Sequence, residues 1–302
     1  MKTARAPATI GNVGPGFDVL GLCVDGLADT VSVSLGERDE VLAQTGRDAA
    51  KLPLDFAKNA AAIAASAVRN QLRPHAHLHL RIDKGLPASG GLGGSAASSV
   101  AGALATFALF DLTPTPEQLM LAALEGEAAV AGRHLDNIAP CVLGSLTIVV
   151  DALKPRVAKV AQPPPGWVAL VTPNFELETK RARSVLPQEV PRAEFIHNMA
   201  ASSALVLAFA CGDARLLRDA LHDHFAEPRR APLIPNFEQA KKAALQAGAL
   251  GSSISGAGPT TFALCETQAV AERAADAMVQ AFGAVRLRHV GAIGSRGAEV
   301  IE

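Results

Sequence analysis

The sequence predicts a two-domain protein of the α+β class. The chain has 302 residues, of which 49% are hydrophobic, so it can bury a sizeable core and is long enough for two domains. Segments with the alternation of strands and segments with the character of helices follow one another along the chain. The proline-rich stretch 161–166 breaks this pattern, and we place the domain boundary there. The expected domains are residues 1–160 and 161–302.

The first part of the chain has short stretches in which apolar and polar residues alternate or β-branched residues gather, and longer alanine-rich stretches. The short stretches predict strands over Thr30–Leu35, His75–Ile82 and Leu143–Val150. The longer stretches predict helices over Phe56–Asn70, Ser95–Phe110 and Pro114–Ala131. In the last of these helices, Thr115 supplies an N-cap and Pro116 occupies the first helical position.

The second part has the same two kinds of segment. Strands are expected over Trp167–Thr172 and near Arg286–His289, and Gly251–Cys265 is glycine-rich at first and apolar afterwards. Helices are expected over Glu194–Phe209, Asp213–Phe225, Phe237–Ala247 and Ala269–Phe282.

Composition argues against several classes of protein. The formal net charge is −1 and no basic block is present, so nothing indicates binding to nucleic acid or to an anionic membrane surface. The N-terminal residues lack the apolar run of a signal peptide, and no apolar run is expected to span a membrane. The four isolated cysteines are those of reduced structural thiols and not of a zinc site. We therefore expect a soluble cytoplasmic protein that binds neither nucleic acid nor a membrane.

The most informative segment is a glycine-rich loop, Pro87–Ser98, that runs into a predicted helix. It holds Gly90, Gly91, Gly93 and Gly94. Glycines remove the side chains that keep a ligand away from the backbone, and free N–H groups at a helix N-terminus attract an anion. The segment therefore predicts a phosphate site, with a simple tight turn as the alternative. The dinucleotide-binding pattern and the ordinary P-loop do not fit its context, because no strand ends at the first glycine and no G-K-[ST] follows.

Two groups of histidines invite a metal interpretation. His75, His77 and His79 alternate along a predicted strand and share a face, but no cysteine or carboxylate lies at ligand spacing. An exposed strand face is the simpler interpretation. The two histidines on either side of Asp223 lie near the end of a predicted helix and are interpreted as structural.

Three further segments gather glycine, proline and polar residues: Ala6–Gly21, His134–Pro140 and Gly251–Thr260. Each alone could be a turn. In this order around the glycine-rich loop, they make nearly the whole chain resemble the GHMP kinase superfamily, with its N-terminal substrate segment, P-x-x-x-G-L-G-x-S and late S-G-x-G-P. Within the superfamily, the chain is most similar to the homoserine kinases. That closer similarity rests on Asn12–Asp18, His134–Pro140, Thr179–Arg183 before Leu186, and Glu227–Arg230 before Leu233.

The resemblance implies a two-domain GHMP kinase fold, with an N-terminal domain like ribosomal protein S5 domain 2 and a ferredoxin-like C-terminal domain. The active site would lie in the crevice between them. The implied reaction is transfer of the ATP γ-phosphate to the side-chain hydroxyl of L-homoserine in threonine biosynthesis, with Mg²⁺ as cofactor and a homodimer as one expected assembly. Two alternatives stay open: another small-molecule kinase of the superfamily, acting for example on mevalonate or shikimate, or a catalytically silent sensor of ATP or an amino acid.

The residues expected at the nucleotide lie in and near the glycine-rich loop, whose backbone N–H groups would hold the β- and γ-phosphates. By resemblance, the ATP-binding residues are Asn59, Lys84, Pro87, Gly90, Gly91, Leu92, Gly93, Gly94, Ser95 and Ala96. Ser95 and Glu127 would hold Mg²⁺, although Ser95 could instead cap the helix and Glu127 could lie on a solvated helix face. The chain departs from the family pattern at Gly94, where most relatives have serine, and in a shortened spacing before His134.

The acceptor pocket must hold a carboxylate and an ammonium group. By resemblance, Arg183 and Arg230 would clamp the carboxylate, since a guanidinium fork matches two carboxylate oxygens. Their neighbours Arg181 and Arg229 are expected to be solvated, although the pairs could be inverted. Asp136 would hold the ammonium group, and the nearby residues Asp18, His134 and Gly256 complete this set.

The attacking hydroxyl would be positioned by Asn12 and Asn137. Superfamily members that use a general base carry an aspartate at the position of Asn137 and a lysine at the position of Thr9. An amide cannot accept a proton at neutral pH, so we expect direct in-line transfer without a dedicated protein base. As alternatives, Asn12 could occupy a left-handed backbone position, Asp18 could cap a turn, and Asn137 could belong to an Asx-turn.

Overall fold

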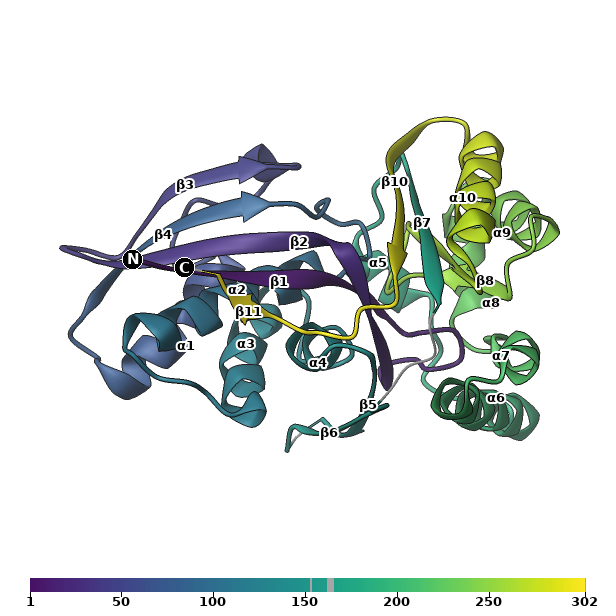
Figure 1. The fold of residues 1–302 in the computed structure, drawn as a ribbon, viewed down its shortest axis with the longest axis horizontal. Coiled ribbons are helices and arrows are strands. Elements are labelled where there is room, and N and C mark those ends of the chain that lie inside the picture. Colours follow the sequence, from purple (N-terminus) through teal and green to yellow (C-terminus); the bar gives the residue numbers. More distant parts are fainter. Residues whose placement is uncertain (153, 162–165, 302) are drawn as a thin grey trace.

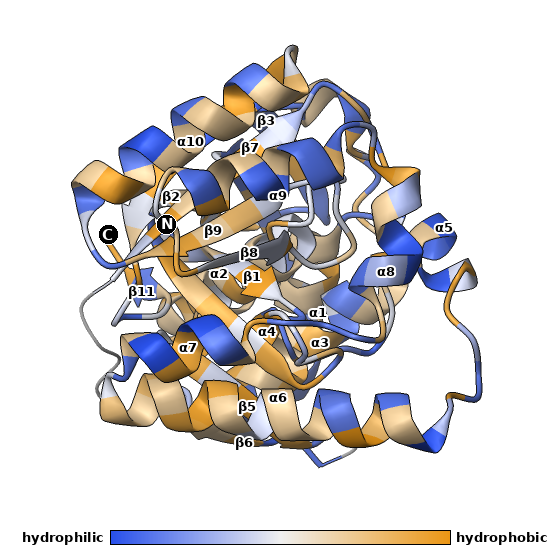
Figure 2. Ribbon diagram, turned by 90° about the vertical axis from the view of Figure 1, so that its right-hand side faces the viewer, coloured by the Kyte–Doolittle hydropathy of each residue, from blue (hydrophilic) through white to orange (hydrophobic). Residues whose placement is uncertain are grey.

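The computed structural model describes residues 1–152, 154–161 and 166–301. These residues form two sheets with helices packed on them, in the mixed α+β arrangement that the sequence predicts (Figure 1). Figure 2 shows the molecule from the end that carries the second sheet. The break in the sequence pattern falls between the two sheets, but residues 162–165 lie outside the described residues.

The first sheet has seven described strands, in the order β11-β1-β2-β4-β3, with β5 beside β2 and β6 beside β5. They are β1 (Lys2–Gly11), β2 (Leu20–Gly36), β3 (Glu40–Gly46), β4 (His77–Lys84), β5 (Leu146–Asp151), β6 (Arg156–Lys159) and β11 (Glu299–Val300). All neighbours are antiparallel except β3 and β4. Because β11 pairs with β1, the C-terminal residues return to the first sheet and are not confined to the predicted second domain.

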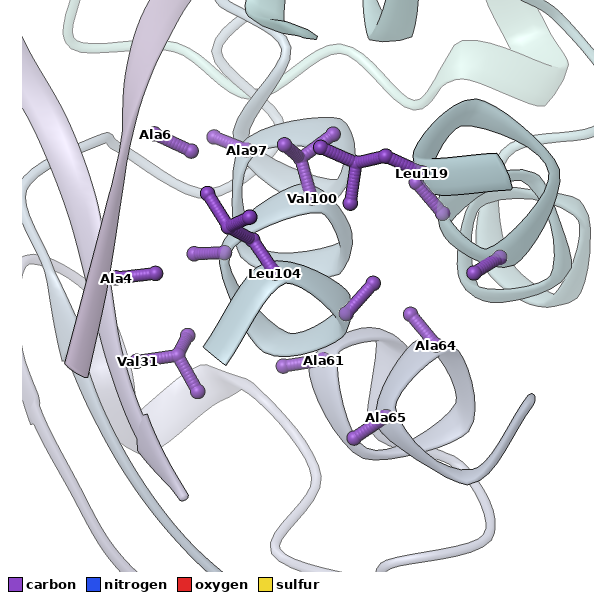
Figure 3. Close-up of a cluster of buried hydrophobic side chains, with 14 of the residues drawn as sticks. Ala4, Ala6, Val31, Ala61, Ala64, Ala65, Ala97, Val100, Leu104 and Leu119 are labelled. Carbon is purple, nitrogen blue, oxygen red and sulfur yellow. The ribbon is translucent and has the colours of Figure 1, made fainter. Parts of the chain in front are cut away.

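Helices pack on the first sheet at close range because their contact faces are made of alanine and glycine. They are α1 (Ala60–Leu72), α2 (Gly94–Leu109), α3 (Pro116–Val130) and the short α4 (Ile138–Leu143), with a 3₁₀ turn η1 (Ala49–Lys51). A Cβ atom at Gly102 would lie 2.5 Å from the carbonyl oxygen of Ala61. Figure 3 shows Ala61 and Ala97 in the resulting cluster, with Val100 and Leu104 filling the larger spaces. Small side chains thus set the short distances between helices in this core.

The second sheet has the order β10-β7-β9-β8 and is antiparallel throughout. Its strands are β7 (Trp167–Pro173), β8 (Gly251–Ile254), β9 (Thr261–Cys265) and β10 (Val285–Ala292). Alternate residues of β7 face opposite sides: Ala169 packs with α9 (Phe237–Gln246) and α10 (Gln268–Phe282), whereas Leu170 packs in the core next to the first sheet. Both faces of this sheet are therefore buried.

One long helix, α6 (Arg192–Cys211), lies at the margin of the molecule beside α7 (Ala214–Ala220) (Figure 2). By length and composition alone, α6 is long and apolar enough to cross a membrane, so the expectation that no such run exists is wrong for this segment. Only a small share of the helix is buried, and Leu205 and Phe209 anchor it in the core next to the first sheet. A single helix of this kind is weak evidence for a membrane span.

Several short elements were not expected from the sequence, among them α5 (Thr179–Ser184), α8 (Glu227–Arg230) and the 3₁₀ turn η2 (Ala231–Leu233). The helix predicted over Asp213–Phe225 is too long, because α7 already ends at Ala220. The side chain of Asp223 instead accepts the backbone N–H groups of Phe225, Ala226 and Glu227, the last at 2.8 Å. Asp223 therefore holds the turn that leads from α7 into α8.

The histidine-containing strand has the exposed face that the sequence predicts. His77 is exposed and His79 half-buried, whereas Leu78 and Leu80, which alternate with them along β4, are fully buried. Among the described residues, no group of three histidine, cysteine or carboxylate side chains is arranged to hold a metal ion.

Candidate active site

A pocket between the two halves of the molecule gathers most of the residues that the sequence singled out. Those that line it are Asn12, Asp18, Asn59, Lys84, Pro87, Gly90, Gly91, Gly93, Gly94, Ser95, Glu127, His134, Asp136, Asn137, Arg183, Arg230 and Gly256. Two members of the predicted ATP-binding set do not: the side chains of Leu92 and Ala96 are buried behind the loop. The fold thus brings together segments that are far apart in the sequence.

The glycine-rich loop needs glycine at two of its positions. Gly91 and Gly93 have φ of 77° and 65°, in the left-handed region. A Cβ atom would lie 2.3 Å from the Ser255 carbonyl oxygen at position 91, and 2.1 Å from the Thr9 hydroxyl at position 93. Helix α2 begins at Gly94 with Gly93 as its N-cap, so the alternative that Ser95 caps this helix is wrong. Ser95 lies instead in the first helical turn.

The carbonyl groups of this loop are held by other segments, while its N–H groups are not. Ser255 donates its hydroxyl to the Gly91 carbonyl at 2.6 Å, and Thr260 donates its hydroxyl and its backbone N–H to the Gly90 carbonyl. Within the described residues, no backbone N–H of residues 89–96 donates to another protein group. A row of free donors at a helix start is the arrangement that binds phosphate.

Lys84 and Asn59 line the pocket, but their polar groups already have protein partners. The Lys84 ammonium pairs with buried Asp29 and donates to Ser98 at 2.7 Å and to the Gly94 carbonyl at 3.0 Å. The Asn59 side chain caps helix α1. Lys84 therefore stabilises the first turns of α2. Direct contact of Lys84 or Asn59 with ATP stays a prediction.

Glu127 lies on α3 with its carboxylate directed into the pocket wall. Its side chain is buried, and its Oε2 atom has no hydrogen-bond partner. Burial raises the pKa of this carboxyl to about 7, against a hydrogen bond from Ser95 that lowers it. The alternative of a solvated helix face is therefore wrong for Glu127. A buried carboxylate oxygen without a partner, beside a hydroxyl, is a donor set that suits Mg²⁺.

Asp18 and Arg183 form the charged centre of the side of the pocket where the acceptor is expected. The Arg183 guanidinium donates to both Asp18 carboxylate oxygens, at 3.0 and 2.8 Å. His134 Nδ1 lies 3.7 Å from the same carboxylate. Asp18 therefore pairs mainly with Arg183. Asn12 has a left-handed backbone, with φ of 54°, as its alternative interpretation predicts. The Asn12 side chain accepts the Asp18 N–H at 2.8 Å, so it also holds the turn between these two residues.

Arg230 is almost completely buried beside this pair. Its guanidinium donates to the carbonyl oxygens of Ala182 and Gly256, at 3.1 and 2.8 Å. The guanidinium carbons of Arg183 and Arg230 each lie 5.2 Å from the centre of the Phe17 ring, a cation–π distance. Burial and the neighbouring Arg183 lower the pKa of Arg230 from its ordinary value. The guanidinium groups of Arg183 and Arg230 thus both contact the Phe17 ring, beside the pocket that the two arginines line.

The neighbouring arginines point elsewhere. Arg181 is exposed, as expected. Arg229 is not free in solvent, because its guanidinium pairs with Glu194 of α6 at 2.8 and 3.0 Å. Neither residue lines the pocket. The geometry therefore favours Arg183 and Arg230 over the inverted choice of arginines.

Asp136 and Asn137 lie at the start of α4, opposite the first strand. Burial, and then the nearby charge of Asp18, raise the pKa of Asp136 to about 7. The Asn137 amide oxygen accepts a hydrogen bond from the Thr9 hydroxyl at 3.0 Å. Asn137 makes no side-chain capping bond to α4, so its side chain is held by Thr9. A neutral hydroxyl–amide pair therefore occupies this part of the pocket.

Two segments of the chain match the halves of one kinase family. Residues 56–145 match the GHMP kinases N-terminal domain, and residues 201–285 match the GHMP kinases C-terminal domain. The chain belongs to the GHMP kinase family. The superfamily and the two-domain α+β fold that the sequence predicts are thereby confirmed, as is the ATP dependence that comes with this family.

The GHMP kinase is similar over nearly its whole length to proteins named homoserine kinase. It is 44% identical to that of Xanthomonas campestris pv. campestris (strain B100) over 294 residues, 95% of this chain and 89% of that protein. It is 40% identical to that of Arabidopsis thaliana over 285 residues, 92% of this chain and 77% of that protein. The crystal structure of homoserine kinase from Cytophaga hutchinsonii ATCC 33406 superimposes with a TM-score of 0.93 at 34% identity, covering 99% of this chain and 97% of that one.

A more distant structure shares only the fold. Mevalonate kinase of L. major, in complex with R-mevalonate, superimposes with a TM-score of 0.76 at 16% identity, covering 97% of this chain and 96% of that one.

Several residues that shape this site were not predicted from the sequence. Thr9 was noted only as the position of an absent lysine, yet it holds Asn137. Ser255 and Thr260 lie in the late segment Gly251–Thr260, which alone could be a turn, yet they donate hydrogen bonds to the carbonyl groups of the glycine-rich loop. Phe17 was part of a motif without a role of its own. In each case the partner lies far away in the sequence, and no local pattern could reveal it.

Proposed function

We propose that this GHMP kinase transfers the γ-phosphate of ATP to the side-chain hydroxyl of L-homoserine, giving O-phospho-L-homoserine for threonine biosynthesis. The observation that carries the proposal is a single pocket with a phosphate loop on one side and paired arginine and aspartate side chains on the other. An amino acid is a zwitterion, so its pocket needs both signs of charge. The consistent naming of relatives at 37–45% identity supports the same substrate.

The acceptor's charged groups would be held by the arginines and aspartates. Arg183 and Arg230 would bind its carboxylate, because both line the pocket and the buried Nε of Arg183 has no hydrogen-bond partner. Asp136 would bind its ammonium group, with Asp18 and His134 nearby, since a buried carboxylate is stabilised in its charged form by an opposite charge. The Asp18 carboxylate pairs with the Arg183 guanidinium in this structure, and the substrate carboxylate would bind the same guanidinium.

The hydroxyl would be oriented by Asn12 and Asn137. Asn137 cannot accept a proton at neutral pH, and its amide oxygen already accepts a hydrogen bond from the Thr9 hydroxyl. The protein would therefore align the hydroxyl with the γ-phosphate and leave the proton to pass to a phosphate oxygen late in the transfer. The neutral Thr9–Asn137 pair also argues against a base-assisted reaction of the mevalonate type.

Ser95 and Glu127 would hold Mg²⁺, because the unpartnered Oε2 atom of Glu127 and the adjacent hydroxyl are the oxygen ligands that this ion prefers. When bound, Mg²⁺ neutralises negative charge on the phosphate oxygens. The cytoplasmic location and the homodimer expected from the sequence remain part of this proposal.

An assay of ADP release with Mg-ATP tests the proposal, with L-homoserine, mevalonate, shikimate or no acceptor in parallel reactions. We expect turnover that depends on homoserine. Turnover with another acceptor would keep the ATP site and overturn the acceptor assignment. ATP binding without any turnover would favour the silent sensor.

A further inference from the structure

The phosphate loop has a second anchor at its first residues, made by two side chains that do not line the pocket. The N–H of Ala88 donates to the Asp48 carboxylate at 3.2 Å, and the carbonyl of Ser89 accepts from Arg286 Nη2 at 3.1 Å. Arg286 Nη1 lies 3.5 Å from Asp48 Oδ2. One carboxylate of the first half and one arginine of the second half thus hold two successive residues of the loop, and also approach each other.

Both charged side chains are well shielded from solvent. The Arg286 side chain is 14% exposed and that of Asp48 is 22% exposed, so their attraction is screened less than that of a surface ion pair. Glu176 extends the cluster, at 3.8 Å from Arg286, and Lys51 pairs with both carboxylates. The cluster therefore connects η1, the phosphate loop and β10.

The anchored residue has a backbone conformation that needs support. Ser89 is not a glycine, yet its φ is 49°, in the left-handed region. Such conformations persist where surrounding contacts hold them. The carbonyl that Arg286 grips belongs to this residue, so the contact fixes the peptide that leads into Gly90 and Gly91. Loss of Arg286 would free this peptide at the entrance to the row of phosphate-binding N–H groups.

The backbone of β10 explains how the arginine reaches the loop. Its pairing with β7 shifts register between Val285 and Leu287, and such an irregularity re-aims the side chain between them. Arg288, only two residues further, serves a different partner: it bonds to Glu272 and Asp276 of α10, at 2.6 and 2.8 Å. The same strand therefore offers an arginine that touches the loop and an arginine that does not.

We infer that Arg286, together with Asp48, is a positioning residue for ATP, because it fixes the start of the phosphate loop from the opposite half of the molecule. This inference rests on the proposed use of ATP. Arg286 also balances the negative charges of Asp48 and Glu176. Without Arg286, Lys51 alone would pair with these two carboxylates, and they would repel the phosphates of ATP. Its removal would weaken ATP binding through both geometry and repulsion, while the acceptor pocket keeps its own contacts.

The test compares Arg286→Gln and Arg286→Lys with Arg288→Gln as a matched control. For each full-length protein, calorimetry gives the Kd of Mg-ATP, and steady-state kinetics gives the KM of ATP and of homoserine. We expect Arg286→Gln to raise the Kd and KM of ATP about tenfold and to change the KM of homoserine less than about twofold, a selective loss that general destabilisation does not produce. Arg286→Lys keeps the charge and should recover part of the loss. Arg288→Gln should leave ATP affinity within about twofold, even if its Tm falls.

A second substitution separates charge from geometry. Asp48→Asn keeps an oxygen that can accept the Ala88 N–H but removes a negative charge. Added to Arg286→Gln, it should restore ATP affinity by about threefold. Unchanged ATP affinity in Arg286→Gln, or an equal loss in Arg288→Gln, would overturn the inference. Failure of the unmodified protein to bind ATP would be a different result, because it would overturn the proposed function and this inference together.

Discussion

The two sides of the pocket are built by opposite means. The side proposed to bind the nucleotide is made of backbone: a continuous loop of glycines whose carbonyl groups accept hydrogen bonds from Ser255 and Thr260. The side proposed to bind the acceptor is made of charged side chains from separate segments, with Asp18 and Arg183 as its centre and Arg230 beside them. Phosphate is the same in every ATP reaction, whereas the acceptor must be distinguished from other alcohols. Backbone suits the first task and charge the second.

This difference predicts how each side responds to substitution. Replacing a left-handed glycine of the loop by alanine should impair ATP binding, because the backbone conformation at that position disfavours any side chain. Removing or exchanging charge should damage the acceptor side while ATP binding survives.

The largest effect is expected from Gly93→Ala. Its Cβ atom would lie 2.1 Å from the Thr9 hydroxyl, and its φ of 65° strains any side chain. We expect kcat/KM for ATP to fall by about 100-fold or more, because a small displacement of the phosphates misaligns the transfer. Steady-state kinetics with ATP as the varied substrate measures this.

Gly94→Ala is the matched control for that change. Gly94 has no left-handed backbone, and a Cβ atom there would meet nothing closer than the Pro87 carbonyl at 3.6 Å. We expect its kcat/KM for ATP to stay within about threefold of the unmodified value. Equal losses at Gly93 and Gly94 would show that steric access to the backbone does not govern this side.

Next in size is Arg230→Lys, compared with Arg229→Lys. Lysine keeps the charge of Arg230 but cannot bond to the Ala182 and Gly256 carbonyls and a carboxylate together. We expect kcat/KM for homoserine to fall by about 10- to 100-fold, with the Kd of ATP unchanged. Arg229→Lys should change either value less than about twofold, because Arg229 faces Glu194. A comparable loss in both variants would contradict the assignment of Arg230.

Asn137→Ala should have a smaller effect that is confined to turnover. It removes the amide that Thr9 holds in the pocket, so the hydroxyl loses part of its alignment. We expect kcat to fall by about tenfold while the Kd of ATP stays the same, as calorimetry on the same protein would show. Unchanged turnover would remove Asn137 from the mechanism.

The smallest effect is a pH dependence that belongs to Asp136. Burial raises its pKa to about 7, and only the ionised carboxylate can hold an ammonium group. At saturating Mg-ATP, we expect kcat/KM for homoserine to fall about fivefold as the pH is lowered from about 7 to about 6. Asp136→Asn should have a lower kcat/KM for homoserine, and this kcat/KM should not fall further at acidic pH. Because the folded pKa lies above the ordinary value, ionisation of this carboxyl destabilises the fold progressively as the pH rises from about 4 to about 7. Asp136→Asn should therefore also flatten the pH dependence of the Tm over that range.

Local patterns predicted most of the regular elements and the phosphate loop. The helix predicted over Phe237–Ala247 ends one residue earlier in α9, and the alanine-rich run after the loop forms α2. Strand β1 was missed, because its residues are small and Pro7 interrupts the alternation. Strand β3 was missed because its apolar residues are adjacent and do not alternate with polar ones, and the strand is formed by its parallel pairing with β4.

The side-chain contacts of the site were the least predictable part. Family resemblance named Asp18 and Arg183, but their ion pair joins residues that are 165 positions apart. The anchor formed by Asp48 and Arg286 has no local signal at all. Contacts of this kind arise only when the two halves come together, and a pattern read along the chain does not contain them.

The central claim is that charge selects the acceptor while the backbone binds the nucleotide. The most direct test measures kcat/KM for L-homoserine and for its analogue without the carboxylate in the same ADP-release assay, together with the KM of ATP. Our account predicts a loss of about 100-fold or more for the analogue, with the KM of ATP unchanged, because paired arginines lose their carboxylate. Equal kcat/KM values for the two acceptors would contradict it.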